Sequence, residues 1–269
     1  MEWLEILRNC RDNIKRKIEP FLGSRQPQQC LGVGAGGDPI KIVDIVAEEA
    51  VVETLIKEGV SFTLISEETG VRSYGHKPKD VYVTIDPIDG TTNFTRGIPF
   101  YATSIAVSSD LKLSTVFAAM VADLFHNEMY VAQKGQGAMR NENKISPSSQ
   151  VDLEEAVIGI DLNTYKVYEV APRISRVIAQ TKHIRHLGAN ALELCYVADG
   201  RIDSFIDLRG KLRATDVAAA WLVIKEAGGE ITNPEGRPLD AKLDPKEHIA
   251  FIASGNKIIH SRILELLMA

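Results

Sequence analysis

The chain has little cysteine, and this scarcity argues against two kinds of protein. Three cysteines occur among 269 residues, at positions 10, 30 and 195, and none of them forms a Cys-x-x-Cys pair. An odd number of scattered cysteines argues against a disulfide framework, and the missing pair argues against a structural zinc site. We therefore expect a protein of a reducing, cytoplasmic environment.

The chain also lacks long apolar runs and basic runs. No stretch approaches membrane-spanning length, and Glu2 and Glu5 stand where a signal peptide would be basic and then apolar. The net charge of -5 argues against nucleic acid as a partner. An acidic protein that binds an anionic substrate would need cations between the two. We therefore expect a small-molecule enzyme with no membrane or nucleic-acid partner.

What is present is ordinary globular composition, with 45% hydrophobic and 25% charged residues, enough for one large or two modest cores. Apolar residues at three- and four-residue spacing from Trp3 to Phe21 predict an amphipathic helix that ends near Pro20 to Gly23. Residues 45–56 predict a second helix, and residues 62–65 predict a short strand.

A glycine-rich segment, Gly32–Gly37, satisfies the pattern G-x-G-x-x-G. Polar residues Gln26–Gln29 precede it where a dinucleotide fold would have a buried strand, and no helix follows at once. We therefore expect a mobile glycine loop and not a nucleotide site.

Short apolar segments with turn-length gaps predict an antiparallel meander that ends at Gly135–Gly137. Beyond it, a polar stretch from Asn141 to Asp152 predicts a boundary, which gives an N-terminal α+β half over 1–152 and a C-terminal α/β half over 153–269. The meander strands are expected at 101–107, 113–121 and 128–133. The second half is expected to alternate strands at 156–162, 183–187, 204–207 and 249–254 with helices at 167–179, 190–198, 214–226 and 258–267.

The densest chemistry lies between residues 81 and 94. Residues 81–85 alternate apolar and polar side chains, which predicts a strand, and Pro87 predicts that this strand stops at Asp86. Asp86 and Asp89 are three residues apart in a turn tightened by Pro87 and Gly90. Both carboxylates can therefore converge on one point, which suits a hard cation.

The segment Gly90–Thr92 can open a helix whose unpaired amides face the same space, as an anion site does. Carboxylates for Mg²⁺ beside amides for a phosphate indicate phosphate-ester chemistry. The pentapeptide Asp-Pro-x-Asp-Gly is also typical of an ordinary loop between a strand and a helix, with Thr91 or Thr92 as the N-cap. The pentapeptide alone leaves both interpretations open.

The longer string at 86–94, Asp-Pro-Ile-Asp-Gly-Thr-Thr-Asn-Phe, resembles the signature of the inositol monophosphatase family of Mg²⁺-dependent, lithium-sensitive phosphatases. The segment Ala214–Ala220 is similar to the family's second signature, Trp-Asp-x-Ala-Ala, with Thr215 in place of the aromatic residue. The pattern is followed from about Asp38 to the C-terminus. The resemblance implies a layered α-β-α-β-α sandwich and a homodimer.

The resemblance also implies a set of metal ligands for two or three Mg²⁺ ions per site, with Mn²⁺ as a possible substitute. Two such ions about 4 Å apart can neutralise charge on both the attacking and the departing oxygen. By this hypothesis Glu67, Asp86 and the Ile88 carbonyl hold the ion that binds the attacking water. Asp86, Asp89 and Asp216 hold the ion that supports the leaving oxygen.

A base is still needed because Mg²⁺ acidifies water less than Zn²⁺ does. The resemblance implies that Asp44 acts through Thr91 in this role, and that the Gly90–Thr92 amides hold the phosphate. Asp44 and Asp216 are also typical helix N-caps, and the two roles are compatible. The resemblance also implies that the glycine loop borders the active site, where Asp38 can visit a further cation, but a plain solvated loop residue is the preferred interpretation of Asp38.

Similarity to the archaeal branch of the family implies substrate contacts at Arg185, Asn190 and Arg209, in addition to Asp89 and the Gly90–Thr92 segment. The basic loop at 207–213 would suit a second phosphate. This favours hydrolysis of fructose 1,6-bisphosphate to fructose 6-phosphate, as in gluconeogenesis, and of inositol 1-phosphate to inositol. A strict inositol-1-monophosphatase is the alternative, and a regulatory binding protein that keeps the phosphatase fold is an alternative of another class.

Overall fold

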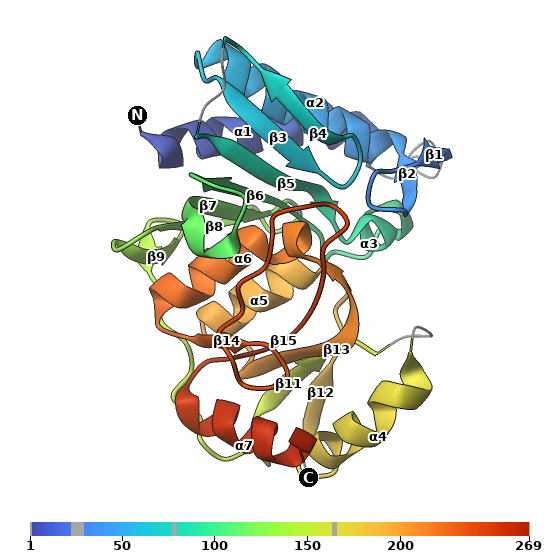
Figure 1. The fold of residues 1–269 in the computed structure, drawn as a ribbon, viewed down its shortest axis with the longest axis vertical. Coiled ribbons are helices and arrows are strands. Elements are labelled where there is room, and N and C mark those ends of the chain that lie inside the picture. Colours follow the sequence, from blue (N-terminus) through green and yellow to red (C-terminus); the bar gives the residue numbers. More distant parts are fainter. Residues whose placement is uncertain (1, 23–29, 77–79, 163–165, 269) are drawn as a thin grey trace.

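The computed structural model describes residues 2–22, 30–76, 80–162 and 166–268, so the predicted polar lead-in Gln26–Gln29 lies outside the described residues. Five layers follow one another along the long axis of the molecule (Figure 1). They are a pair of helices, an eight-stranded sheet, a second pair of helices, a five-stranded sheet and a third pair of helices. The expected α-β-α-β-α sandwich is therefore confirmed.

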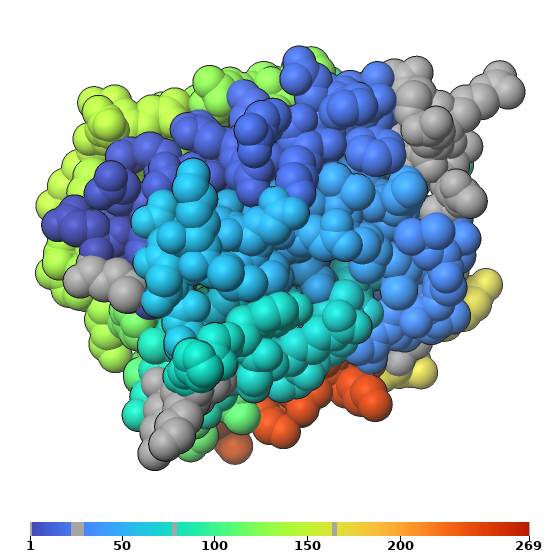
Figure 2. Space-filling model, turned by 90° about the horizontal axis from the view of Figure 1, so that it is seen from above, coloured from blue at the N-terminus to red at the C-terminus, as the bar shows by residue number. Residues whose placement is uncertain are grey.

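The first helical layer consists of α1 (Trp3–Ile18) and α2 (Ile42–Lys57). Leu7, Cys10 and Ile14 of α1 are fully buried, which confirms the predicted apolar stripe, and a 3-10 turn, η1 (Glu19–Phe21), ends the segment. Seen from above, the N-terminal half of the chain covers most of the visible face (Figure 2).

The eight-stranded sheet has the order β10-β9-β8-β7-β6-β5-β3-β4. Neighbouring strands are antiparallel except β3 and β5, which are parallel. The predicted meander is confirmed, but it continues past Gly137. The strands are β3 (Phe62–Ser66), β4 (Gly70–Tyr74), β5 (Tyr82–Asp89), β6 (Ala102–Ser108), β7 (Val116–Asp123), β8 (Glu128–Gln133), β9 (Gly137–Arg140) and β10 (Asn143–Lys144), with a 3-10 turn, η3 (Leu113–Thr115), before β7.

The lower half has a five-stranded sheet of order β12-β11-β13-β15-β14, in which β11 is parallel to β12 and β13. Helices α5 and α6 lie between the two sheets, and α4 and α7 cover the outer face (Figure 1). The alternation predicted for this half is confirmed, but the segment expected as a basic loop at 207–213 is part of the strand β13. Its elements are β11 (Val157–Ile160), α4 (Val167–Ile178), β12 (His183–Arg185), α5 (Asn190–Ala198), β13 (Ser204–Arg213), α6 (Ala214–Ala227), β14 (Glu230–Thr232), β15 (His248–Ser254) and α7 (Lys257–Met268).

The strand before the acidic motif does not stop at Asp86 as predicted. β5 continues to Asp89, and its pairing with β6 shifts register between Asp86 and Asp89. Pro87 lies within this shift, where its missing N–H costs the ladder no regular hydrogen bond. The irregularity keeps Asp86 and Asp89 on a rigid strand instead of a free turn.

The glycine segment also differs from the prediction of a mobile loop. It is the turn of a short antiparallel hairpin, formed by β1 (Cys30–Val33) and β2 (Pro39–Lys41), which we call the β1–β2 hairpin. The amides of Ala35 and Gly36 donate to the carbonyls of Glu68 and Glu67, at 3.1 and 2.8 Å. The hairpin is therefore docked on the segment that follows β3.

The prediction that Asp44 and Asp216 are N-cap residues is wrong by three positions, because the N-caps are Lys41 and Arg213. Asp44 and Asp216 are the third residues of α2 and α6, and each accepts a hydrogen bond from the backbone N–H of the N-cap residue, Lys41 or Arg213. This is the return arm of a capping box, so the acids still stabilise the helix starts.

None of the helices in the described ranges is long and apolar enough to cross a membrane.

The two halves are tied together by Asn93, on the short helix α3 (Thr91–Arg96). Its buried amide nitrogen donates to the carbonyls of Phe100 and Leu187, both at 2.8 Å. Replacing Asn93 with Ala leaves both acceptors without this donor, so we expect a loss of about 1 to 3 kcal/mol in the free energy of unfolding. Urea denaturation measures it.

The matched control is Thr95→Ala, two residues further along α3, whose hydroxyl donates to the Thr92 carbonyl of the same helix at 3.1 Å. This variant should change stability by less than about 0.5 kcal/mol. Equal losses in the two variants would mean that Asn93 does not tie the halves together.

Candidate active site

A pocket of about 430 Å³ lies where the β1–β2 hairpin, the ends of β3, β5 and β13, and the starts of α2, α3, α5 and α6 meet. Its wall carries acids from four separate segments of the chain. It also contains every residue predicted for the site except Arg185 and Arg209, namely Asp44, Glu67, Asp86, Ile88, Asp89, Gly90, Thr91, Thr92, Asn190 and Asp216.

Parallel pairing of β3 and β5 brings two of these acids together. Ser66 is in register with Ile85, so Glu67 and Asp86 follow at the same edge of the sheet. Asp86 is almost fully buried, and its Oδ1 atom has no hydrogen-bond partner among the residues that the structure describes. Burial, and next the charge of Glu67, raise the pKa of Asp86 well above its ordinary value. A carboxylate in this position needs a cation nearby.

Asp89 connects the acidic pocket to the lower half of the molecule. Its two carboxylate oxygens accept hydrogen bonds from the backbone amides of Asn190 and Leu192, at 2.7 and 3.0 Å, in the first turn of α5. The acid therefore satisfies amides that the helix leaves without internal partners. Burial raises the pKa of Asp89 to about 7 although these hydrogen bonds lower it.

Asp44 and Thr91 are in contact, as the predicted pair requires. The Thr91 hydroxyl lies 3.3 Å from Asp44 Oδ1 and donates to the Ile88 carbonyl at 2.9 Å. Asp44 is 3% exposed, and burial raises its pKa to about 7. A carboxyl group with a pKa near neutrality is suited to exchange a proton.

Gly90 precedes α3 at the floor of the pocket and must be glycine for two reasons. Its φ of 85° lies in the left-handed region. A Cβ atom here would lie 3.0 Å from Ala189 Cβ and 3.1 Å from the Gly188 carbonyl, on the opposite half of the molecule. The motif glycine thus permits close approach of the two halves.

Arg213 is the main site residue that sequence reasoning missed. Its guanidinium forms ion pairs with Glu67, with Asp216 at 3.2 Å and with Asp38 at 3.1 Å. The only local signal was its place three residues before Asp216, as the N-cap of α6. Contacts with Asp38 and Glu67 have no signature in the sequence.

A second missed residue is Glu48, which binds residues on both sides of Glu67 in the sequence. This buried carboxylate accepts hydrogen bonds from the hydroxyl groups of Ser66, at 2.5 Å, and Thr69. Ser66 Oγ in turn accepts from the Glu68 amide at 3.1 Å. Glu48 therefore fixes the turn that carries Glu67 toward the pocket.

Two predicted substrate contacts lie elsewhere. Arg209 is 3% exposed, and its guanidinium is bound by Asp207, at 2.6 Å, and by Asp161, so the prediction that it faces substrate is corrected. Burial of a guanidinium favours such double pairing. Arg185 is exposed, donates to the carbonyl of its neighbour Ile184 and does not line the pocket.

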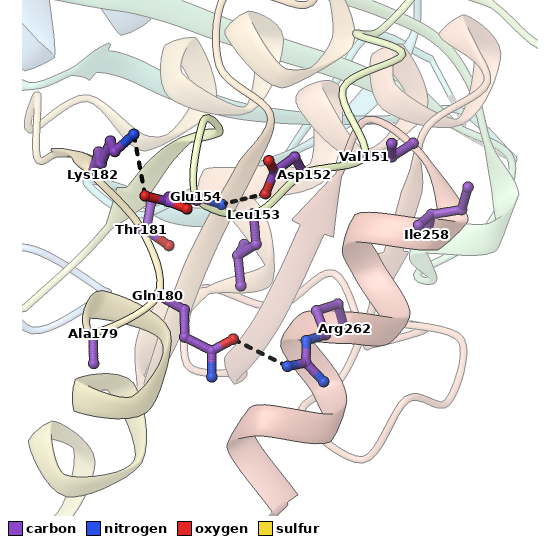
Figure 3. Close-up of a pocket in the computed structure, with 10 residues that line it drawn as sticks. All are labelled: Val151, Asp152, Leu153, Glu154, Ala179, Gln180, Thr181, Lys182, Ile258 and Arg262. Atoms are coloured by element: carbon purple, nitrogen blue, oxygen red, sulfur yellow. Dashed lines mark hydrogen bonds and ion pairs between the residues drawn. The ribbon is translucent and has the colours of Figure 1, made fainter.

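A larger surface hollow, of about 720 Å³, lies between the end of α4, the segment before β11 and the start of α7 (Figure 3). Its polar groups are paired with one another: Lys182 with Glu154 at 3.2 Å, and Arg262 with Gln180 at 3.1 Å. None of the predicted site residues lines it. The smaller acidic pocket is therefore the better candidate.

Comparison with known proteins agrees with this assignment. A protein of Methanothermobacter thermautotrophicus named fructose-1,6-bisphosphatase/inositol-1-monophosphatase is 38% identical over 98% of this chain and 96% of its own. A bifunctional NADP phosphatase/NAD kinase of Methanococcus maripaludis is 30% identical over 98% of this chain, which spans 49% of that longer protein.

Among solved structures, an inositol monophosphatase-fructose 1,6 bisphosphatase superposes with a TM-score of 0.87 at 30% identity, covering 99% of this chain and all of that one. The family model for the inositol monophosphatase family matches residues 9–268. The expected resemblance and the expected enzyme class, a phosphatase, are confirmed. The chain belongs to the inositol monophosphatase family.

Proposed function

We propose that the protein is a Mg²⁺-dependent phosphate monoesterase that hydrolyses fructose 1,6-bisphosphate and inositol 1-phosphate. The observation that carries the proposal is the convergence of Glu67, Asp86, Asp89 and Asp216 on one pocket, beside the Asp44–Thr91 pair. The names of the archaeal relatives support the choice of substrates.

The donor set of the pocket suits a hard divalent cation. All the candidate ligands are oxygens, which Mg²⁺ prefers, and the buried Asp86 Oδ1 atom has no hydrogen-bond partner in the described part of the chain. Within the described residues no group of three acids, histidines or cysteines is already arranged around one point. The Arg213 guanidinium lies between two of the acids instead. The residues therefore fit a metal by chemistry, with Arg213 as a rival cation.

The residues proposed to hold Mg²⁺ are Glu67, Asp86, Asp89 and Asp216, with the Ile88 carbonyl. When bound, the metal would supply positive charge to a phosphate and its attacking water. Asp89 stays fixed by the α5 amides, so it can orient a ligand without moving.

The remaining residues hold the proton and the phosphate. The Thr91 hydroxyl, in contact with Asp44, can accept a proton from a water molecule and pass one to the Asp44 carboxylate. Gly90, Thr91 and Thr92, at the start of α3, line the same pocket, and their backbone amides would bind phosphate oxygens. Asn190 lines the pocket, and its buried Oδ1 atom, which has no partner within the described ranges, can accept a hydrogen bond from a substrate hydroxyl.

Several parts of the proposal stay predictions. A strict inositol-1-monophosphatase is the alternative within the class, and with Arg209 paired internally the basic loop no longer favours the bisphosphate. A regulatory binding protein is less well supported, because all four acids and Thr91 are retained in the pocket. A homodimer and a cytoplasmic location stay predictions as well.

A substrate panel tests the reaction and separates these alternatives. Phosphate release from fructose 1,6-bisphosphate, inositol 1-phosphate and NADP is measured with Mg²⁺, with EDTA and with Mg²⁺ plus lithium. We expect hydrolysis of the first two only with Mg²⁺, and inhibition by lithium. Turnover of inositol 1-phosphate alone would identify the protein as a strict inositol-1-monophosphatase. Turnover of NADP alone would show that the substrate is a nucleotide phosphate and not a sugar or inositol phosphate. The absence of turnover with all three substrates would contradict the proposal.

The variant Asp216→Asn tests the ligand set. Asparagine keeps the shape of the side chain and can still accept a hydrogen bond from the Arg213 amide, so the protein should fold normally. Loss of the charge should lower kcat about 100-fold or more. The control is Glu235→Gln, an exposed acid outside the pocket, which should keep wild-type kcat. A kcat near wild type for Asp216→Asn in saturating Mg²⁺ would disprove the role of Asp216.

The raised pKa values predict how stability depends on pH. Asp44 and Asp89 bind protons up to about pH 7 in the folded protein, as a result of burial, but only to about pH 4 when unfolded. The folded state therefore binds more protons between these values, and stability falls as the pH rises. In EDTA we expect a loss of roughly 2 to 4 kcal/mol between pH 5 and pH 8.

The measurement is urea unfolding at both pH values, with EDTA and with saturating Mg²⁺. Mg²⁺ should reduce the loss because it compensates the ionised acids, and Asp44→Asn should reduce it in EDTA because one titrating group is gone. Stability in EDTA that is constant or rises with pH would show that the acids are not held as described.

A further inference from the structure

Arg213 joins three segments of the chain that are far apart in sequence. From the end of β13 its guanidinium reaches Glu67 after β3, Asp216 in the first turn of α6 and Asp38 in the β1–β2 hairpin. The Arg213 side chain is only 11% exposed. A guanidinium that is always charged and can donate in several directions is suited to such a junction.

Two of these three partners belong to the proposed metal ligands. The Arg213 guanidinium binds Glu67 through Oε2, and its Nε atom lies 3.2 and 3.3 Å from the two oxygens of Asp216. The same oxygens cannot pair fully with the guanidinium and with a divalent ion. The proposed ligands Glu67 and Asp216 are thus already paired with a cation of the protein itself, whose single positive charge they share.

The contact with the hairpin is also close. A Cβ atom on Gly36 would lie 2.3 Å from Arg213 Nη1, so the guanidinium packs against the glycine backbone. The Gly36 amide donates to the Glu67 carbonyl at 2.8 Å, which places the hairpin and the guanidinium on the same acidic residue. The hairpin and the acids therefore share one cation.

We propose that Arg213 is an internal cation that competes with a divalent metal ion for Glu67 and Asp216 and that holds the β1–β2 hairpin over the pocket through Asp38. The inference rests on the proposed metal-dependent function. It makes Arg213 a positioning residue whose removal should help metal binding, the opposite of what removal of a metal ligand would do.

Binding of Mn²⁺ to protein stripped with EDTA tests the competition directly, by calorimetry and by the paramagnetic resonance signal of the free ion. We expect Arg213→Gln to bind Mn²⁺ about 10-fold more tightly than wild type or better, as expected for loss of a close charge pair. Arg213→Lys keeps the charge without the planar fork and should lie between the two.

The matched control is Lys211→Gln, which removes the same charge from the same strand at an exposed position. Its Mn²⁺ affinity should stay within about 2-fold of wild type, because solvent screens exposed charges. An equal gain in Mn²⁺ affinity in the two variants would show that the effect comes from net charge alone and not from the position of Arg213. Unchanged or weaker binding by Arg213→Gln would overturn the proposal.

A third variant, Gly36→Ala, keeps every charge and moves only the guanidinium. Its backbone lies outside the left-handed region, but the new methyl group would occupy the space of Arg213 Nη1. Displacement of the guanidinium should tighten Mn²⁺ binding, by less than in Arg213→Gln. This variant covers the case in which Arg213→Gln does not fold, and wild-type affinity here would count against the proposal.

Amide hydrogen exchange of residues 30–41 gives a readout of the hairpin. In EDTA, exchange at Ala35 and Gly36 should be faster in Arg213→Gln than in wild type or in Lys211→Gln, because the tie to Asp38 is lost. Equal exchange would show that Arg213 does not hold the hairpin. Wild-type protein that binds neither Mn²⁺ nor Mg²⁺ would instead reject the proposed function, so the two failures can be told apart.

Discussion

The structure depends on one electrostatic constraint, the gathering of several carboxylates in a poorly hydrated pocket. Like charges at short range repel, and burial removes the water that would screen them. Three kinds of positive partner offset this repulsion. These are the backbone amides of α5 on Asp89, the guanidinium of Arg213 on Glu67 and Asp216, and the proposed metal for Asp86.

This arrangement explains why the pocket lies at the junction of the two halves. The N-terminal half contributes Glu67, Asp86 and Asp89, while the C-terminal half contributes Asp216, Arg213 and the first turn of α5. Asp216 has its partner Arg213 in its own half, whereas Glu67 and Asp89 find their partners Arg213 and the α5 amides in the other half. Asn93 and Asp89 reach across the junction by hydrogen bonds, in addition to the hydrophobic core that α5 and α6 share with the eight-stranded sheet.

Sequence reasoning succeeded where the signal was local. The order of strands and helices follows from apolar spacing, and three of the pocket acids lie in two short motifs, Asp86 and Asp89 in one and Asp216 in the other. It failed where a residue's role depends on distant contacts. Arg209 was assigned to substrate from similarity to the archaeal branch of the family, but Asp161, 48 residues away, binds it. Arg213 was overlooked because Asp38 is 175 residues away.

The close approach at Gly90 has an evolutionary consequence. Ala189 Cβ would lie 3.0 Å from any side chain introduced at position 90. Positions 90 and 189 belong to different halves of the molecule, yet neither can enlarge without separating α3 from α5. Substitutions at these two positions are therefore coupled. A bulkier residue at either position would push α3 and α5 apart and change the width of the cleft without contacting a reacting group.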